Sequence, residues 1–131
     1  MLLYHFAEPA NRTAILERGL LPVVEPKRMS GDVAVVWLTS EPTTVLSAAD
    51  RAEFKKQGDS GTRWILDRPL RVTVRIGSHD NKLARYADWL RRTPLWEGKP
   101  ASLPFEAMQA WWIYRGVIVP AKIVECVDVA D

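Results

Sequence analysis

The chain has 131 residues, of which 47% are hydrophobic and 26% are charged, and its formal net charge is +2. This composition predicts one globular domain over residues 1–131, and so small a charge does not by itself indicate a nucleic-acid partner. The single cysteine, Cys126, excludes a disulfide within the chain. Together with the missing signal-peptide pattern it favours a cytoplasmic protein, and no apolar run has transmembrane length.

The first predicted strand covers residues 2–6 and is apolar except for His5. Pro9 suits the first turn of a following helix, where its missing N–H has no cost. Gly19 suits the position just past the end of that helix. A buried imidazole needs hydrogen-bond partners. His5 therefore fits either a core histidine with its partners or a ligand-binding histidine.

The next elements are separated by proline- and glycine-containing segments. Residues 33–39 are almost continuously apolar and rich in β-branched side chains, which predicts a buried central strand. A short helix is expected over residues 47–56, with a possible edge strand at 63–66. Residues 70–76 alternate apolar and polar positions, which predicts a strand with one buried face and one basic face.

The last third contains one expected helix and two expected strands. Asp80 can cap a helix that runs to about Arg92. After a loop, residues 111–114 and 122–129 read as strands. The first of them turns at Arg115-Gly116, and residues 117–119 continue from that turn to Pro120. The predicted fold is α+β, with a mixed, mostly antiparallel split sheet of about six short strands and two or three helices.

Several common chemistries lack their sequence signals. No glycine-rich phosphate loop or dinucleotide fingerprint is present, and no serine lies in a nucleophile elbow. His5, His79 and Cys126 are too far apart in sequence to show metal-ligand spacing. These absences argue against most hydrolases and metalloenzymes.

Three ordered motifs resemble ADP-ribosyltransferase-like domains, among them DNA-modifying toxins, rifampin-modifying enzymes and tRNA 2′-phosphotransferases. The first is Tyr4-His5-Phe6 followed by a helix that ends in Gly19-Leu20. The second is the aromatic strand end Val36-Trp37-Leu38-Thr39, and the third is the closing segment 112–123 with its Val119-Pro120. The order and spacing of the three carry more weight than any one of them.

The resemblance implies NAD as co-substrate and a macromolecular target, in the style of a toxin or a phage effector. His5 would lie near the adenosine-side ribose, and Trp37 with Thr39 would help to form the nicotinamide pocket. Arg71 or Arg75 could bind the diphosphate in a bidentate manner, although a solvated strand face fits both arginines as well. The expected cofactor-binding residues are Tyr4, His5, Phe6, Trp37, Thr39, Arg75 and Tyr114.

The catalytic acid is where the sequence departs from the family pattern. Toxins and rifampin enzymes place a Glu or Asp near the start of the closing strands, a register that Trp111 and Trp112 occupy here. Glu106, just upstream, is the candidate acid, so the expected catalytic residues are His5 and Glu106. The missing acid motivates a second hypothesis, a non-catalytic pocket for a nucleotide or an ADP-ribose-like ligand.

A third hypothesis is a small nucleic-acid-binding protein that combines arginines with exposed aromatic rings. The arginines concerned are Arg63, Arg68, Arg71, Arg75, Arg85, Arg91 and Arg92.

Overall fold

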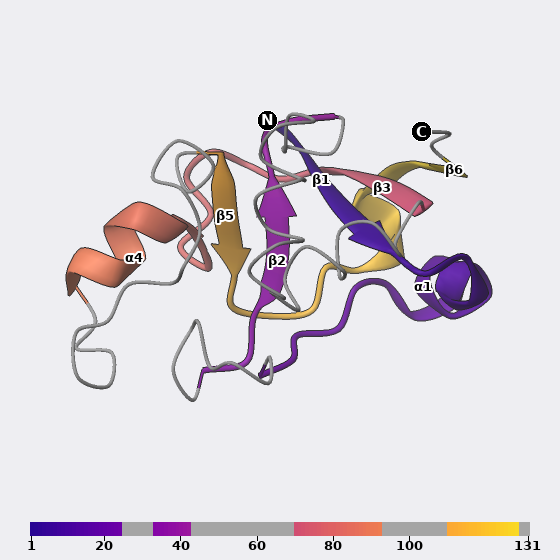
Figure 1. Ribbon diagram of the computed structural model, residues 1–131, viewed down its shortest axis with the longest axis horizontal. Coiled ribbons are helices and arrows are strands. Elements are labelled where there is room, and N and C mark those ends of the chain that lie inside the picture. The colour runs from indigo at the N-terminus through magenta and orange to yellow at the C-terminus, as the bar shows by residue number, and fades with distance from the viewer. Residues whose placement is uncertain (25–32, 43–69, 93–109, 129–131) are drawn as a thin grey trace, which may run out of the picture.

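A computed structural model describes residues 1–24, 33–42, 70–92 and 110–128 (Figure 1). None of the helices in these ranges is long and apolar enough to span a bilayer. In chain order the elements are β1 (Leu2–Ala7), the 3-10 helix η1 (Pro9–Asn11), α1 (Arg12–Arg18), β2 (Val36–Thr39), β3 (Leu70–Arg75), β4 (Leu83–Arg85), α4 (Tyr86–Arg92), β5 (Trp111–Tyr114), the 3-10 helix η3 (Pro120–Lys122) and β6 (Ile123–Asp128).

The six strands form one hydrogen-bonded sheet in the order β4-β5-β2-β1-β3-β6. The expected α+β class is confirmed, and β2 takes the interior position that its apolar run predicted. We expected a mixed sheet, but every pair among the described strands is antiparallel.

The sheet has a narrow junction at its centre. β1 pairs with β3 along six registered residues, and β2 pairs with β5 along four. Between β1 and β2 only one registered pair exists, Tyr4 with Thr39. Beyond it the two strands diverge, as the wide angle between them in Figure 1 shows. The sheet therefore consists of two halves, β1-β3-β6 and β2-β5-β4, joined at one pair.

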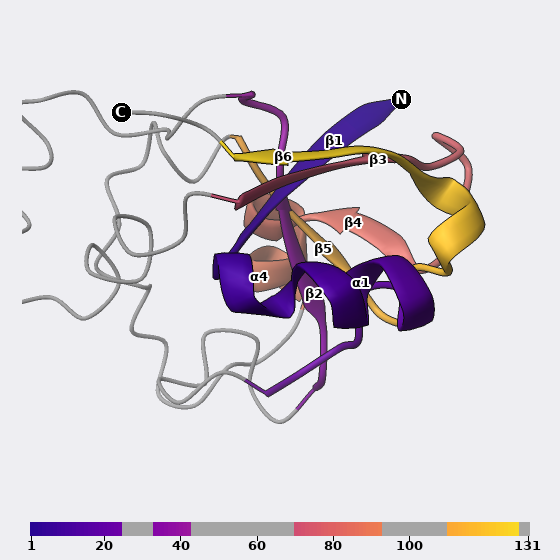
Figure 2. The ribbon, with the colours of Figure 1, turned by 90° about the vertical axis from the view of Figure 1, so that its right-hand side faces the viewer.

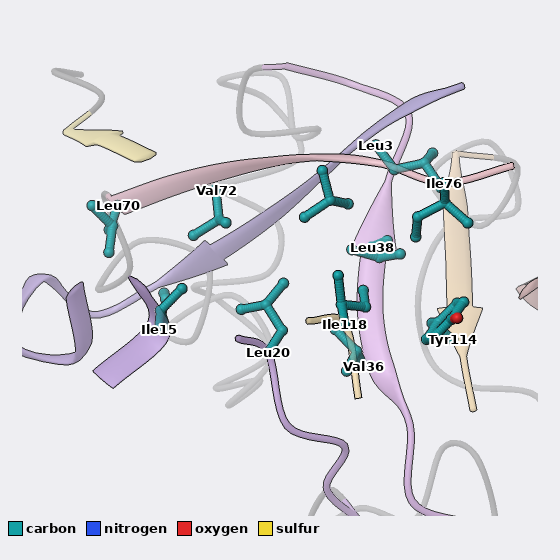
Figure 3. Packing of buried hydrophobic residues seen from close by; sticks show 12 residues of the cluster. Leu3, Ile15, Leu20, Val36, Leu38, Leu70, Val72, Ile76, Tyr114 and Ile118 are labelled. Atoms are coloured by element: carbon teal, nitrogen blue, oxygen red, sulfur yellow. The ribbon is translucent and has the colours of Figure 1, made fainter. Parts of the chain in front are cut away.

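One face of the sheet, which we call the α1 face, packs against α1 and the segment after it. Leu20 and Ile118 exchange backbone hydrogen bonds, and both side chains enter the wedge where β1 and β2 part (Figure 3). The buried cluster on this face comprises Leu3, Ala7, Ile15, Leu20, Val36, Leu38, Leu70, Val72, Val74, Ile76, Tyr114 and Ile118. The alternation of residues 70–76 thus predicted the buried side of β3 correctly.

The opposite face, which we call the Trp37 face, carries the intervening residues of each strand. Side chains alternate between faces along a strand, so register alone assigns them. Tyr86 at the start of α4 packs edge-on against Trp37, with 4.8 Å between ring centroids. The strand residues on this face include Tyr4, Phe6, Trp37, Thr39, Arg71, Thr73, Arg75, Trp111, Ile113 and Glu125.

Gly19 ends α1 as predicted, with φ = 83°. The backbone turns here so tightly that a Cβ on Gly19 would overlap the carbonyl oxygen of Ile118. That oxygen also accepts a hydrogen bond from the N–H of Leu20, at 2.9 Å. Gly19 is therefore needed for two reasons: its positive φ and the close approach of the Ile118 backbone to the end of α1. Figure 2 shows the segment before β6 passing close to α1.

The expected helix from Asp80 to Arg92 is wrong in its first half. Residues 83–85 form β4, which pairs with β5, and the helix begins only at Tyr86. The reason is that Asp80 has other partners. It accepts hydrogen bonds from the Lys82 N–H and from the Tyr114 hydroxyl, so it closes a turn instead of capping a helix.

Other expectations differ in detail or fall elsewhere. The chain bends at Arg115-Gly116 after β5, as expected, and in residues 117–119 only Ile118 forms a bridge, with Leu20. The predicted helix at 47–56, the edge strand at 63–66 and Glu106 lie outside the described residues.

Candidate functional site at the β1–β2 junction

A row of side chains crosses the Trp37 face at right angles to the strands. Tyr4 is opposite Thr73 on β3 and opposite Thr39 on β2, the one pair that joins the two halves. Glu125 continues the row on β6, and Trp111 continues it on β5. We call these five residues the polar row. Four strand spacings give it a length of roughly 19 Å, which suits an elongated ligand.

The polar row is buried in its middle and open at its β6 end. Thr39 and Thr73 are 1% and 6% exposed, whereas the Glu125 side chain is 50% exposed. Tyr4 is half-buried between them. A ligand would therefore reach the row from the side of β3 and β6.

Arg71 lies two residues before Thr73, on the same face of β3, and its guanidinium contacts three other residues. Its Nη1 donates to the carbonyl oxygen of Pro42 at 2.8 Å, and its guanidinium lies over the Tyr4 ring, 5.7 Å from the centroid. Its Nη2 is 3.6 Å from Oε1 of Glu125. Arg71 thus places a fixed positive charge beside the open end of the polar row.

His5 bridges the gap between the diverging strands. Its register places it on the α1 face, and its Nδ1 lies 2.7 Å from the carbonyl oxygen of Trp37. A carbonyl only accepts, so Nδ1 carries the proton in this contact. In the neutral ring Nε2 then holds the lone pair.

Trp37 anchors the Trp37 face at the junction. Its ring contacts Tyr86 and also Trp111 edge-on, with 6.0 Å between the Trp37 and Trp111 centroids. Its Nε1 is buried and has no hydrogen-bond partner among the residues that the structure describes. A buried indole N–H normally finds an acceptor, so this donor is suited to a ligand atom.

The expected cofactor-binding residues divide between the two faces. Tyr4, Phe6, Trp37, Thr39 and Arg75 lie on the Trp37 face, and Tyr4 and Thr39 are directly paired. His5 and Tyr114 lie on the α1 face, although His5 contacts the backbone of β2. Arg75 is exposed at the end of β3, opposite Leu2.

Tyr114 has a different set of contacts from the one expected. Its hydroxyl donates to Oδ2 of Asp80 at 2.8 Å, and Lys122 Nζ lies 3.7 Å from the same oxygen. Burial, followed by the hydrogen bond to Asp80, raises the pKa of Tyr114 to about 12. The Lys82 N–H and the Tyr114 hydroxyl together lower the pKa of Asp80. The contacts of Asp80 therefore connect the turn before β4 to Tyr114 on β5 and to Lys122 on η3.

Sequence reasoning did not select Glu125 or Thr73. Both stand at polar positions in alternating strands, and that alternation was the available signal. The register between β3 and β6, which the sequence does not give, brings them opposite one another. In the described ranges no three His, Cys, Asp or Glu residues gather as a metal site.

The arginines of the nucleic-acid hypothesis do not share a face. Arg71 lies on the Trp37 face, whereas Arg85 pairs with Trp112 on the α1 face and lies over its ring, 5.5 Å from the centroid. Arg63 and Arg68 fall outside the described residues.

No family model matches this chain, and comparisons with curated proteins and with solved structures also find no match. The likeness to ADP-ribosyltransferase-like domains therefore stays a prediction from the sequence motifs.

Proposed function

We propose that this protein binds NAD at the β1–β2 junction and transfers the ADP-ribosyl group to a macromolecule. One observation supports the proposal most. The first and second motifs, more than thirty residues apart in sequence, meet at the junction, where Tyr4 pairs with Thr39 and His5 contacts the carbonyl of Trp37 at 2.7 Å.

Cleavage of NAD depends more on how the protein positions the ribose than on proton transfer by an acid or a base. The bond between C1′ of the ribose and the nicotinamide nitrogen breaks, and its electron pair leaves with the nicotinamide, neutralising the ring charge. A nucleophilic atom of the target then bonds to C1′ and releases its proton. The protein has to hold the ribose and stabilise the positive charge that develops on it.

In this proposal each junction residue has a role. His5 lies on the α1 face, so it acts as a positioning residue: its Nδ1–H holds the carbonyl of Trp37 and fixes the strand that carries Trp37 and Thr39. Trp37 and Thr39 form part of the nicotinamide pocket, with the Trp37 Nε1 as a donor. Of the two arginines of β3, Arg71 suits the diphosphate better than Arg75, because Arg71 is fixed beside Tyr4 whereas Arg75 lies exposed at the strand end. Glu106 is the proposed carboxylate that stabilises the ribosyl cation.

Nicotinamide release from NAD tests the activity. The wild-type chain should release nicotinamide, and Glu106→Gln should reduce the rate by about 10²-fold or more if Glu106 carries the charge stabilisation. Glu17→Gln, at an exposed position of α1, is the matched control and should keep the wild-type rate. An equal rate in Glu106→Gln and wild type would exclude Glu106 as the acid.

His5→Ala should abolish NAD-dependent labelling of a target, while His79→Ala, an exposed turn position, should not. Because His5 also links two strands, circular dichroism must show that the His5 variant remains folded. Unchanged labelling by a folded His5→Ala variant would contradict the proposal.

A second candidate function is ligand binding without catalysis. The observation that favours it is that the acid of the polar row, Glu125, is already paired with Arg71. Calorimetry with NAD and with ADP-ribose separates the two functions. Tight binding without nicotinamide release supports the binding protein, and rapid release excludes it.

A further inference from the structure

The ion pair between Arg71 and Glu125 is incomplete. The distance of 3.6 Å from Nη2 to Oε1 exceeds the 2.7–2.9 Å that is typical of a charge-assisted hydrogen bond. The neighbouring donor, Nε of Arg71, is buried and has no hydrogen-bond partner in the described part of the chain. Nε and Nη2 share one edge of the guanidinium, the edge that binds a carboxylate or phosphate through two parallel hydrogen bonds.

The rest of the guanidinium is already fixed. Nη1 donates to the Pro42 carbonyl, and the plane lies over Tyr4. The Nε–Nη2 edge therefore remains for an anion, and its Nη2 lies beside the half-exposed carboxylate of Glu125. A preorganised arginine of this kind loses little conformational freedom on binding.

We infer that the Nε–Nη2 edge of Arg71 is a diphosphate subsite that Glu125 occupies in the free protein and leaves when the ligand binds. The inference rests on the proposed dinucleotide site, and it makes Glu125 an internal competitor that determines specificity. A phosphate brings more negative charge and more acceptor oxygens than the carboxylate, so it can replace Glu125. Released Glu125 returns to water at little cost, because its side chain is half exposed on an edge strand.

Removing the competing charge should tighten the binding of anionic ligands only. Titration calorimetry with ADP-ribose should show Glu125→Gln binding about two- to fivefold more tightly than wild type, the range that a partly exposed ion pair implies. Adenosine, which has no phosphate, should bind both forms equally. Arg71→Gln should weaken ADP-ribose binding by about tenfold or more.

Asp128→Asn is the matched control, since it removes the same charge from the same strand. Asp128 pairs with Arg12 on the α1 face, away from Arg71, so its variant should bind ADP-ribose as wild type does. Thermal melts of all three variants confirm that the β3–β6 pairing is retained.

The outcomes separate this inference from the proposed activity. Unchanged or weaker ADP-ribose binding by a folded Glu125→Gln variant overturns the subsite, even if the chain cleaves NAD. Pyrophosphate is the second probe. Tighter pyrophosphate binding by Glu125→Gln than by wild type, without nicotinamide release from NAD, supports the anion subsite and contradicts the transferase. Absence of binding of both pyrophosphate and ADP-ribose to wild type overturns the subsite.

Discussion

His5 connects β1 to β2 where the backbone ladder does not: its Nδ1 lies 2.7 Å from the carbonyl oxygen of Trp37. The two strands share one registered pair and then diverge. The imidazole supplies a donor to a carbonyl beside the point of divergence. This contact accounts for a polar ring in an otherwise apolar strand, whatever further role His5 has.

The first prediction concerns this contact. His5→Ala should lower the free energy of unfolding by about 1–3 kcal/mol, because it leaves the half-buried carbonyl of Trp37 without this donor. Urea denaturation followed by circular dichroism measures the change. His79→Ala, in an exposed turn, should be within about 0.5 kcal/mol of wild type. Equal effects of the two variants would contradict the assigned role of His5.

The second prediction concerns the end of α1. Gly19→Ala should destabilise the fold by about 2 kcal/mol or more, because alanine disfavours the positive φ and its Cβ would overlap the Ile118 carbonyl. Gly77 is the comparison, since a Cβ there meets no atom within 4 Å. Gly77→Ala should be close to neutral. Thermal unfolding distinguishes the two, and a neutral Gly19→Ala would show that α1 can end differently.

The third prediction is the response to acid. The pKa of Asp80 is lowered from 3.8, mainly by the Lys82 N–H and then by the Tyr114 hydroxyl. A lowered carboxyl pKa adds stability above the unfolded value and loses it as the pH falls through the folded value. Asp80→Asn should therefore unfold with a smaller dependence on pH below about pH 4 than wild type does. Parallel curves for the two proteins would contradict the assignment.

The fourth prediction is the response to alkali, which depends on Tyr114, the hydrogen-bond partner of Asp80. The pKa of Tyr114 is raised from 10.0 to about 12, so its contribution is complete below pH 10 and is lost as the pH rises towards 12. Tyr114→Phe should be about 1 kcal/mol less stable at pH 7 and should lose less stability than wild type between pH 10 and 12. Chemical denaturation at a series of pH values provides the comparison, and identical slopes would exclude the raised pKa.

The chain's one cysteine supplies the fifth prediction. Burial raises the pKa of the Cys126 thiol above 9.0. Only the thiolate reacts with disulfide reagents, so Cys126 should react more slowly at pH 8 in the folded chain than in urea. Absorbance of the released thiol product follows the reaction. Equal rates in the two states would mean that the thiol is open to solvent.

The sequence predicted elements where local and tertiary preferences agree. The alternation of residues 70–76 and the apolar run of residues 33–39 gave β3 and β2, and Pro9 with Gly19 bounded the first helical segment correctly. The predicted start of the second helix was wrong, because the i, i+3 spacing of Leu83 and Tyr86 fits a helix, whereas Leu83 lies in β4. There Asp80 bonds to Tyr114, thirty-four residues away, and no local pattern encodes that partner.

The candidate site was less accessible to sequence reasoning, because it depends on register. The motifs selected Tyr4, Trp37 and Thr39, which share a face, but they could not assign His5 to the opposite face. Two arginines of β3 were equivalent by pattern. The pairing of β3 with β6 brings Glu125 to Arg71, and the contacts of Arg71 with Tyr4 and Pro42 further distinguish it from Arg75.

The single Tyr4–Thr39 pair also has a consequence for how the protein opens. Few interstrand amide bonds cross from one half of the sheet to the other, so the halves should open as separate units. In hydrogen–deuterium exchange, the amides of β1 and β3 should share one protection factor and those of β2 and β5 another.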